Sequence, residues 1–295
     1  MLSFDRIDTV LVRGATQAVG IRPPAVAGSF YPREPQRLRA VLSDCMAGAV
    51  ASQLAPIVSA GPRRGGNPRP KALICPHAGY VYSGPIAASA YRALGEATHG
   101  IERVVIIGPS HFVPFAGLAV PRAGAFATPL GAVAVDERAR RAILAVPHVV
   151  AADAPHAREH SLEVQLPFLQ SLLGDFQVLP IAAGEATAPQ VATALECLWG
   201  GEDTLIVVSS DLSHYLDYAA ARRVDRETAQ AILEYSTGLG SAQACGCVVI
   251  NGLMYAARRR RLDVRLLDLR NSGDTSAERT SVVGYGAFAL YEPGR

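Results

Sequence analysis

From Lys71 onward, short apolar runs alternate with longer amphipathic stretches, and this alternation narrows the fold more than any other feature of the sequence. The runs at 72–75, 103–108 and 204–210 read ALIC, RVVIIG and TLIVVSS. Such nearly continuous apolar runs are typical of strands buried on both faces of a parallel sheet. The stretches between them have the spacing of helices. The pattern therefore predicts a single α/β domain with a mostly parallel or mixed central sheet flanked by helices.

Local sequence patterns predict the domain boundary and the positions of further strands and helices. Residues 1–24 have weak periodicity and end in two prolines, so we interpret them as an N-terminal arm that precedes a domain at 25–295. The length of 295 residues permits two domains, but α/β folds often use this much chain as one. GLAVP and GAVAV predict two short strands or a hairpin. Helices are expected over 35–46, 85–94 with Ser83 as N-cap, 136–146, 189–199, 219–235 and from Cys247. A further helix is expected in HSLEVQLPFLQSLL, where it must bend or start near Pro167.

Composition excludes several classes of protein. The 28 basic and 26 acidic residues leave a formal charge of +2, which argues against electrostatic binding of nucleic acid. The N-terminus lacks a signal-peptide pattern, and no run of about 18 uncharged apolar residues occurs. We therefore expect a cytoplasmic protein without a membrane partner. Five irregularly spaced cysteines favour reduced thiols over a disulfide framework.

Histidines come directly after three of the predicted strands. His77 comes after ALIC, His111 after VVIIG, and Asp211 and His214 after LIVVSS. Because the carboxyl ends of strands in an open α/β sheet converge on one crevice, we expect these loops to face one pocket. A single histidine at a strand end is usually an ordinary loop or core residue, but three comparable loops weigh against that interpretation. Imidazoles from separate strands suit a metal ion.

Two cysteines precede a predicted helix in the segment Cys245-Gly246-Cys247. Unpaired N–H groups and the helix dipole favour a thiolate at such a position. A metal ligand, a redox thiol and a cysteine packed under the helix are all open interpretations. Cys75, on a predicted buried strand, is expected to be a core residue.

The segment HAREHSLEVQLPF brings further polar residues to a predicted helix start. His160 stands beside Glu163 and Gln165, with Glu159 and Ser161 as capping candidates. One of these side chains could reach the pocket, but capping and surface solvation are the interpretations we favour. The arginine run at 258–261 is expected to complement the dipole at a helix C-terminus.

Several common catalytic signatures are missing from the sequence. It contains no G-x-S-x-G, G-x-x-x-x-G-K-[ST], H-E-x-x-H or C-x-x-C motif. The usual hydrolase, NTPase, zincin and dithiol redox routes therefore lack their signatures. The remaining candidates for reactive groups are the His, Asp and Cys side chains of the predicted pocket.

At these residues the chain resembles the Memo family, whose bacterial members are called AmmeMemoRadiSam system protein B. The resemblance covers nearly everything after residue 21 and rests on the strings RPPAVAGSFYP, PHAGYVYSGPIAASAY, GPSH, EHSLEVQLPFLQ, SSDLSHY, ACG, NSGD and VVGYGAFAL. It implies a domain like the class III extradiol non-haem iron dioxygenases. It also implies that His77, His111 and Cys245 are metal ligands, with Asp211 and His214 beside them.

The resemblance does not transfer an activity unchanged. Extradiol enzymes use two histidines and a carboxylate, whereas a softer, oxidisable thiolate stands here at the third position. Iron(II) or copper is the expected cofactor, and zinc is a weaker candidate. His214, oriented by Asp211, would act as acid/base or as a donor beside the metal. Cys247, where the family usually continues with a basic residue and a Pro-Ile pair, and Cys75, which replaces Ala or Val, are local departures.

These residues support three functional hypotheses. The leading one is a metal-dependent redox or oxygenase-like enzyme. The alternative is a non-catalytic binding or scaffold protein that keeps the pocket and acts with radical-SAM and AMMECR1-type partners, which the family name implies. The third is zinc-dependent hydrolysis at the same ligands. The small-molecule or peptide ligand is left open by the sequence.

Overall fold

The apolar runs become the middle of a nine-stranded mixed sheet in the computed structural model, which describes residues 20–49, 69–95 and 98–293. In spatial order the strands are β10 (His214–Leu216), β12 (Val282–Tyr291), β2 (Ala72–Cys75), β9 (Thr204–Ser209), β3 (Arg103–Pro109), β8 (Gln177–Ala183), β4 (Leu118–Val120) and β7 (Val149–Ala151). Strand β11 (Asp263–Asn271) pairs with β12 outside this path.

The four central strands β2, β9, β3 and β8 are mutually parallel. Nearly all of their residues are buried, so both faces of the sheet are covered, and this explains why the runs are apolar without alternation. Strand β12 is antiparallel to β2 and β11, and β4 is antiparallel to β8. The prediction of a single α/β domain with a mixed central sheet is confirmed.

A smaller sheet contains β1 (Ile21–Arg22), β5 (Ala125–Thr128) and β6 (Gly131–Ala134). The expected strands in GLAVP and GAVAV both form, as β4 and β6, but they belong to different sheets. The hairpin partner of β6 is β5.

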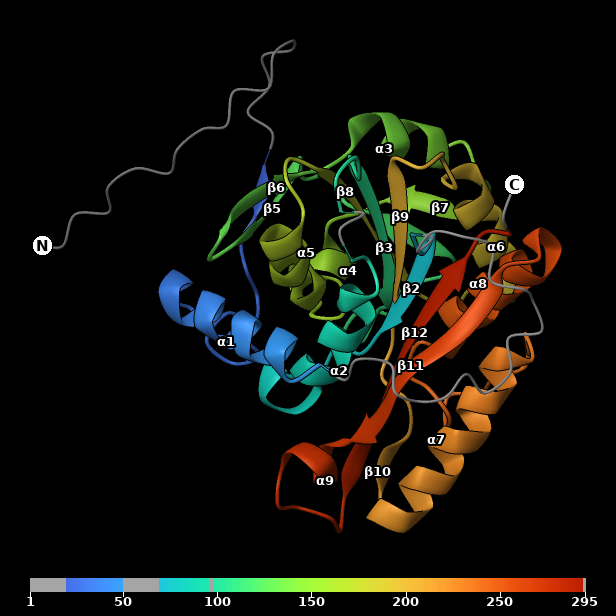
Figure 1. Ribbon diagram of the computed structural model, residues 1–295. Helices are drawn as coiled ribbons and strands as arrows, with labels where there is room; N and C mark the ends of the chain where they lie inside the picture. Colours follow the sequence, from blue (N-terminus) through green and yellow to red (C-terminus); the bar gives the residue numbers. More distant parts are fainter. Residues whose placement is uncertain (1–19, 50–68, 96–97, 294–295) are drawn as a thin grey trace, which may run out of the picture.

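Helices cover the sheet on both sides (Figure 1). They are α1 (Pro35–Ala47), α2 (Tyr80–Arg92), α3 (Glu137–Ile143), α4 (Ala154–Ala157), the 3₁₀ turn η1 (Glu163–Gln165), α5 (Leu166–Leu172), α6 (Ala188–Cys197), α7 (Tyr218–Leu233), α8 (Cys247–Arg260) and α9 (Ser272–Thr275). Helices α1, α2 and α5 lie to the left of the sheet in Figure 1, and α6, α7 and α8 lie to its right. No helix in the described ranges is long and apolar enough to cross a membrane.

Helix α2 begins earlier than predicted. The expected N-cap, Ser83, lies inside the helix, where its hydroxyl donates to Ala78 O. The carbonyl of Gly79 instead accepts from the N–H groups of Tyr82 and Ser83, so the helix starts at Tyr80. Pro85 is therefore an interior residue of the helix and does not mark its first turn.

Residues 1–19 of the predicted arm lie outside the described residues, but its last part belongs to the folded domain. Ile21 and Arg22 form β1, which pairs in parallel with β5. Arg22 is buried and forms an ion pair with Glu163, which is also buried.

Candidate metal site

Parallel strands bring the predicted loops to one edge of the sheet. His77, His111 and Asp211 each stand two residues beyond the end of their strand, and these strands are neighbours in the order β2, β9, β3. The rings of His77 and His111 meet edge to face with 5.2 Å between centroids. The loops that carry His77 and His111 therefore lie side by side, as predicted from the strand order.

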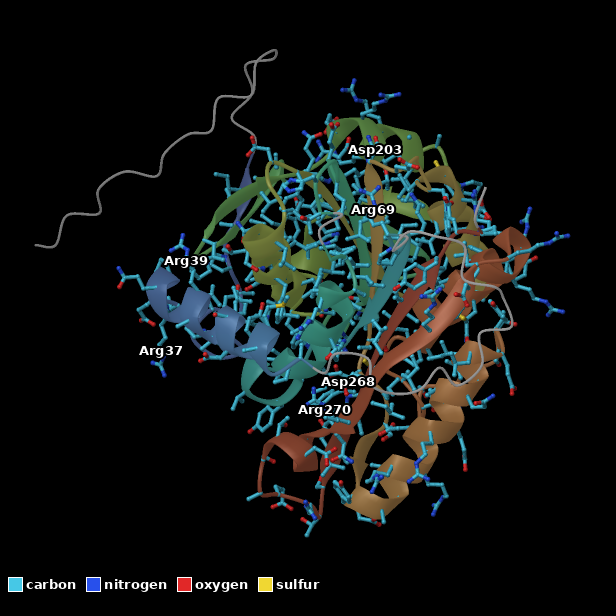
Figure 2. The ribbon with its side chains drawn as sticks, in the orientation of Figure 1. Arg37, Arg39, Arg69, Asp203, Asp268 and Arg270 are labelled. Carbon is cyan, nitrogen blue, oxygen red and sulfur yellow. The ribbon has the colours of Figure 1, made fainter. Side chains whose placement is uncertain are left out.

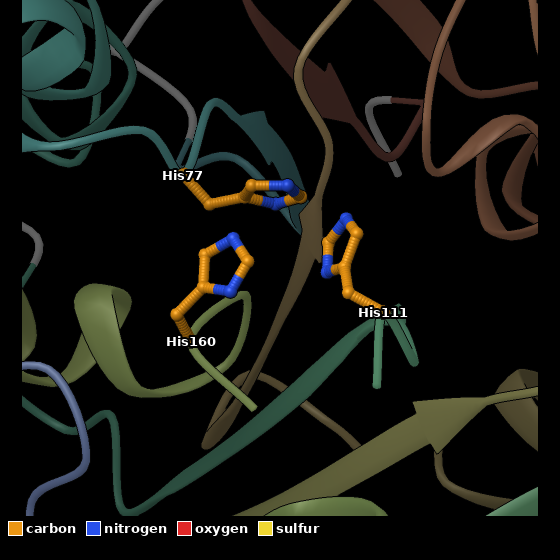
Figure 3. A group of neighbouring side chains, drawn as sticks. All are labelled: His77, His111 and His160. Atoms are coloured by element: carbon orange, nitrogen blue, oxygen red, sulfur yellow. The ribbon is translucent and has the colours of Figure 1, made fainter. Parts of the chain in front are cut away.

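A third imidazole joins them from a different part of the chain. His160, in the loop before η1, stacks on His111 with 4.6 Å between ring centroids and meets His77 edge to face at 5.4 Å. One ring nitrogen from each residue lies within 4.8 Å of the others. Figure 3 shows the three rings facing a common centre. This spacing allows one ion to contact all three imidazoles.

The proton on the His77 ring can be assigned from its neighbours. Ser209 Oγ donates to Ser161 O at 2.6 Å and so has only acceptor capacity left. His77 Nδ1 lies 3.1 Å from that oxygen and must therefore carry a proton and donate it. Consequently Nε2 of the neutral ring is the atom with a free lone pair. Burial holds the pKa of His77 well below its usual value, so the ring is neutral at pH 7.

A buried amide fixes the serine in turn. Gln165 Nε2 donates to Ser209 Oγ at 2.8 Å and to Pro76 O at 3.0 Å. Its Oε1 accepts from Tyr91 Oη at 2.8 Å. Both the oxygen and the nitrogen of the amide are therefore hydrogen-bonded. This chain of hydrogen bonds fixes the position of Ser209 Oγ and, through it, the orientation of the His77 ring.

Glu159 performs the same role for His111. One carboxylate oxygen accepts from His111 Nδ1 at 2.9 Å and the other from the His111 N–H at 2.6 Å, while the Ser161 N–H adds a third bond. Burial raises the pKa of Glu159, but these donors outweigh burial and lower it to about 2. The ionised carboxylate thus fixes the Nδ1–H tautomer and leaves His111 Nε2 available.

His160 is packed rather than held by hydrogen bonds. Phe30 lies 4.7 Å from its ring centroid and Phe112 lies 5.9 Å away. Among the described residues its Nδ1 has no hydrogen-bond partner, although Glu159 Oε1 is 3.4 Å away. Burial lowers the pKa of His160 to about 4, which keeps this ring neutral as well.

The two predicted catalytic residues lie in the same region, but they do not form a pair. Asp211 Oδ1 accepts from the His77 N–H at 2.7 Å, and burial raises the pKa of Asp211 to about 7. His214 Nδ1 instead lies 2.8 Å from Leu212 O, which orients the ring and leaves Nε2 of the neutral ring as the acceptor. The expectation that Asp211 orients His214 is therefore replaced by orientation through the Leu212 carbonyl.

Cys245 lies beside His77, just before α8. Its Sγ is 3.3 Å from His77 Nε2 and 3.8 Å from Ser210 Oγ. Gly246 allows this approach, because a Cβ there would lie 2.7 Å from Ser210 Cβ. Burial and the nearby Asp211 raise the pKa of Cys245 to about 12. Burial therefore outweighs the helix N-terminus, which favours a thiolate, and the Cys245 thiol is protonated at pH 7. Cys75 is a fully buried core residue, as predicted.

The segment 159–165 contributes more to the site than its sequence pattern predicts. Capping and surface solvation are wrong for its polar residues, because Glu159, Ser161, Glu163 and Gln165 are all buried and bonded to distant parts of the chain. The segment sits inside the string EHSLEVQLPFLQ that carried the family resemblance. That string was the available signal for His160.

Comparison with known proteins assigns the family. The model of the Memo-like protein family matches residues 22–289. A MEMO1 family protein of Nitrosopumilus maritimus is 35% identical over 281 residues, covering 91% of this chain and 98% of the relative. One from Ignicoccus hospitalis is 37% identical over 298 residues, covering 92% and 99%. One from Aeropyrum pernix is 37% identical over 290 residues, with the same coverage. The chain therefore belongs to the Memo family.

Proposed function

We propose that this Memo family protein is a metal-dependent redox or oxygenase-like protein whose ion is held by His77, His111 and His160. The observation that carries the proposal is the convergence of three imidazole nitrogens within 4.8 Å. Iron(II) or copper is the proposed ion, with zinc as a weaker candidate, because neutral imidazoles suit all three metals. Cys245 is proposed as an adjacent fourth donor.

The site residues fit such an ion in their protonation states as well as in their spacing. His77 and His111 both carry their proton on Nδ1, where Ser209 and Glu159 accept it, and both leave Nε2 to bind metal. His77 and His160 are neutral at pH 7 because they are buried. The ionised Glu159 adds a negative charge close behind His111, which favours a bound cation.

The residues around the histidines support a reactive centre. A bound iron or copper ion would supply electron transfer and Lewis acidity. His214 Nε2 can accept a proton from a substrate, because its Nδ1 is held by Leu212 O and burial lowers the pKa of the ring. The Cys245 thiol, 3.3 Å from His77 Nε2, is an oxidisable group at the same place.

Anaerobic reconstitution followed by elemental analysis tests the ligand set. The wild type is expected to retain about one iron or copper ion per chain after desalting. His77→Ala, His111→Ala and His160→Ala are each expected to lose it, whereas His148→Ala, at an exposed loop histidine, should retain it. Equal metal content in the wild type and the three variants would refute the site.

Spectroscopy of the copper-loaded protein tests the role of Cys245. A thiolate bound to copper(II) gives a charge-transfer band in visible light, and Cys245→Ser should remove that band while keeping the metal. An unchanged spectrum in Cys245→Ser would exclude Cys245 as a ligand and leave the three-histidine set intact.

Exposed aromatic side chains favour a second candidate function, the docking of a partner. Phe112 and Tyr215 are 47% and 78% exposed and directly follow His111 and His214, and Tyr82 is 43% exposed on α2. Exposed aromatic residues are enriched where proteins bind one another. Radical-SAM and AMMECR1-type proteins are the proposed partners. Partner binding that persists in a His77→Ala, Cys245→Ala variant, with no metal uptake by the wild type, would favour this function over the first.

A further inference from the structure

A cavity that none of the three histidines lines lies between α7 and β11. Its volume is about 320 Å³, within the range of small-molecule sites. Neither the three histidines nor Cys245 lines it. Its wall residue Asp225 accepts from the Ser213 N–H at 3.0 Å, and Ser213 lies between Asp211 and His214. The cavity is thus one hydrogen bond away from the loop that carries Asp211 and His214.

The floor of this cavity is apolar. Ala229 and Leu233 contribute from α7, and Leu266 and Leu269 contribute from β11. The three leucines are only partly buried, so the protein leaves apolar surface uncovered at the bottom of the cavity. An apolar group of a ligand would cover it.

Three arginines also line the cavity. Arg222 and Arg226 stand one turn apart on α7 and are exposed, and Arg222 has a cation–π contact with Tyr218 at 5.7 Å. Arg270 projects from β11, where its Nε and Nη2 are paired with Asp268 (Figure 2). Because the guanidinium group has five N–H donors, the Nη1 group of Arg270 can still bind an anion.

The two acids in the cavity wall already accept hydrogen bonds from within the protein. Asp225 accepts from Ser213 within the protein, and Asp274 accepts from the Asn271 N–H and from Tyr218 Oη. From the apolar floor and the three arginines, we propose that this cavity binds a small amphipathic carboxylate. Its carboxylate meets the arginines, and its hydrocarbon tail covers the leucines.

Calorimetric titration of the full chain with sodium octanoate tests the proposal. A chelator is present so that carboxylate binding to a metal ion does not contribute. Octanoate should bind saturably with one site per chain, and octanol and acetate should each bind about tenfold more weakly or not at all, because each lacks one half of the recognition. Absence of saturable octanoate binding, or equal binding of octanol, would overturn the proposal.

Variants assign the binding to this cavity. Arg222→Gln/Arg226→Gln should weaken octanoate about tenfold, while Arg223→Gln, on the same helix but not in the cavity, should leave the affinity unchanged. Ala229→Leu, which fills the floor without altering the charges, should also abolish binding. Binding that survives both cavity variants, or that is lost in His77→Ala/His160→Ala, would place octanoate elsewhere.

One further comparison separates a free carboxylate from a lipid surface. Vesicles of phosphatidylcholine with phosphatidic acid should not sediment the wild type more than they sediment Arg222→Gln/Arg226→Gln. Vesicle binding that requires these arginines, without binding of free octanoate, would identify a membrane-docking face and overturn the small-molecule site.

Discussion

Ser209 at the end of β9 illustrates how a single hydroxyl can prepare a metal ligand. Its Oγ accepts hydrogen bonds from His77 and Gln165 and donates one to the Ser161 carbonyl, so its full hydrogen-bonding capacity is used. The same oxygen therefore fixes both the ring orientation and the proton position of His77. At the residue scale, the site depends on such supporting atoms as much as on the three imidazoles.

Replacing this hydroxyl should weaken metal binding without unfolding the protein. In Ser209→Ala the His77 ring loses its Nδ1 acceptor, and we expect the dissociation constant for iron(II) or copper to rise about tenfold or more. Ser171→Ala is the matched control, because Ser171 donates to Phe168 O within α5, away from the histidines. Equal metal affinity in Ser209→Ala and in the control would contradict the supporting role.

His156 supplies a prediction about pH that does not involve the metal site. Burial lowers its pKa from 6.5 to about 4, and its Nε2 donates to Ala119 O at 3.1 Å. The unfolded chain therefore binds more protons than the folded one between these values, and stability falls as pH drops through this window. From pH 7.5 to pH 5 the residue should remove about 2 kcal/mol from the free energy of unfolding.

Urea unfolding at the two pH values checks this expectation. His156→Gln keeps a donor but cannot titrate, so its stability should fall by about 2 kcal/mol less than that of the wild type over the same interval. His99→Gln, at an exposed loop position, should behave like the wild type. Parallel pH dependence of the wild type and His156→Gln would show that His156 is not buried neutral.

At the scale of elements, the two-residue strand β1 is joined to the domain by more than its pairing with β5. Glu163 in η1 accepts from Arg22, from the N–H groups of Ala25 and Val26, and from Tyr31 Oη. Arg22 also donates to two carbonyls in the segment 156–159. One buried carboxylate thus connects the N-terminal strand to the segment that carries His160.

Neutralising this carboxylate should cost more than neutralising one at the surface. Glu163→Gln leaves Arg22 as a buried charge without its counterion, and we expect a loss of about 3 kcal/mol in the free energy of unfolding. Glu137→Gln removes the partner of Arg140 and Arg141 on α3, but Glu137 is 47% exposed and the loss should be below about 1 kcal/mol. Similar losses in chemical denaturation of the two variants would contradict this account.

At the scale of the whole molecule, the three histidines come from separate segments that only the complete sheet brings together. The family assignment and the topology confirm the predicted single α/β domain of the extradiol dioxygenase-like class. A metal ion bound by all three residues would connect β2, β3 and the segment before η1. Metal binding should therefore stabilise the entire domain and not only the loops.

Thermal unfolding under anaerobic conditions measures this coupling. Iron(II) at one hundred times its dissociation constant should raise the free energy of unfolding by about 2.7 kcal/mol, because the folded chain alone has the complete site. His77→Ala/His160→Ala should show no such shift. A shift of the same size in the double variant would mean that iron stabilises the protein elsewhere.

The sequence alone determined the central strands and the polar residues at their carboxyl ends. A strand buried on both faces of a sheet needs a continuous apolar run, so ALIC, RVVIIG and TLIVVSS identified β2, β3 and β9 without tertiary information. Parallel strands present their carboxyl ends at one edge, and therefore His77, His111 and Asp211 could be predicted to meet.

The third imidazole and the orientation of the site depend on contacts between distant segments, which no local pattern predicts. The segment around His160 is polar, and a polar segment is expected to be solvated unless distant partners satisfy it. Here those partners are Arg22, Tyr31, Tyr91 and His111, which local patterns do not connect with residues 159–165. The burial of polar groups depends on long-range hydrogen bonds. The burial of an apolar strand can instead be predicted from the strand's own residues.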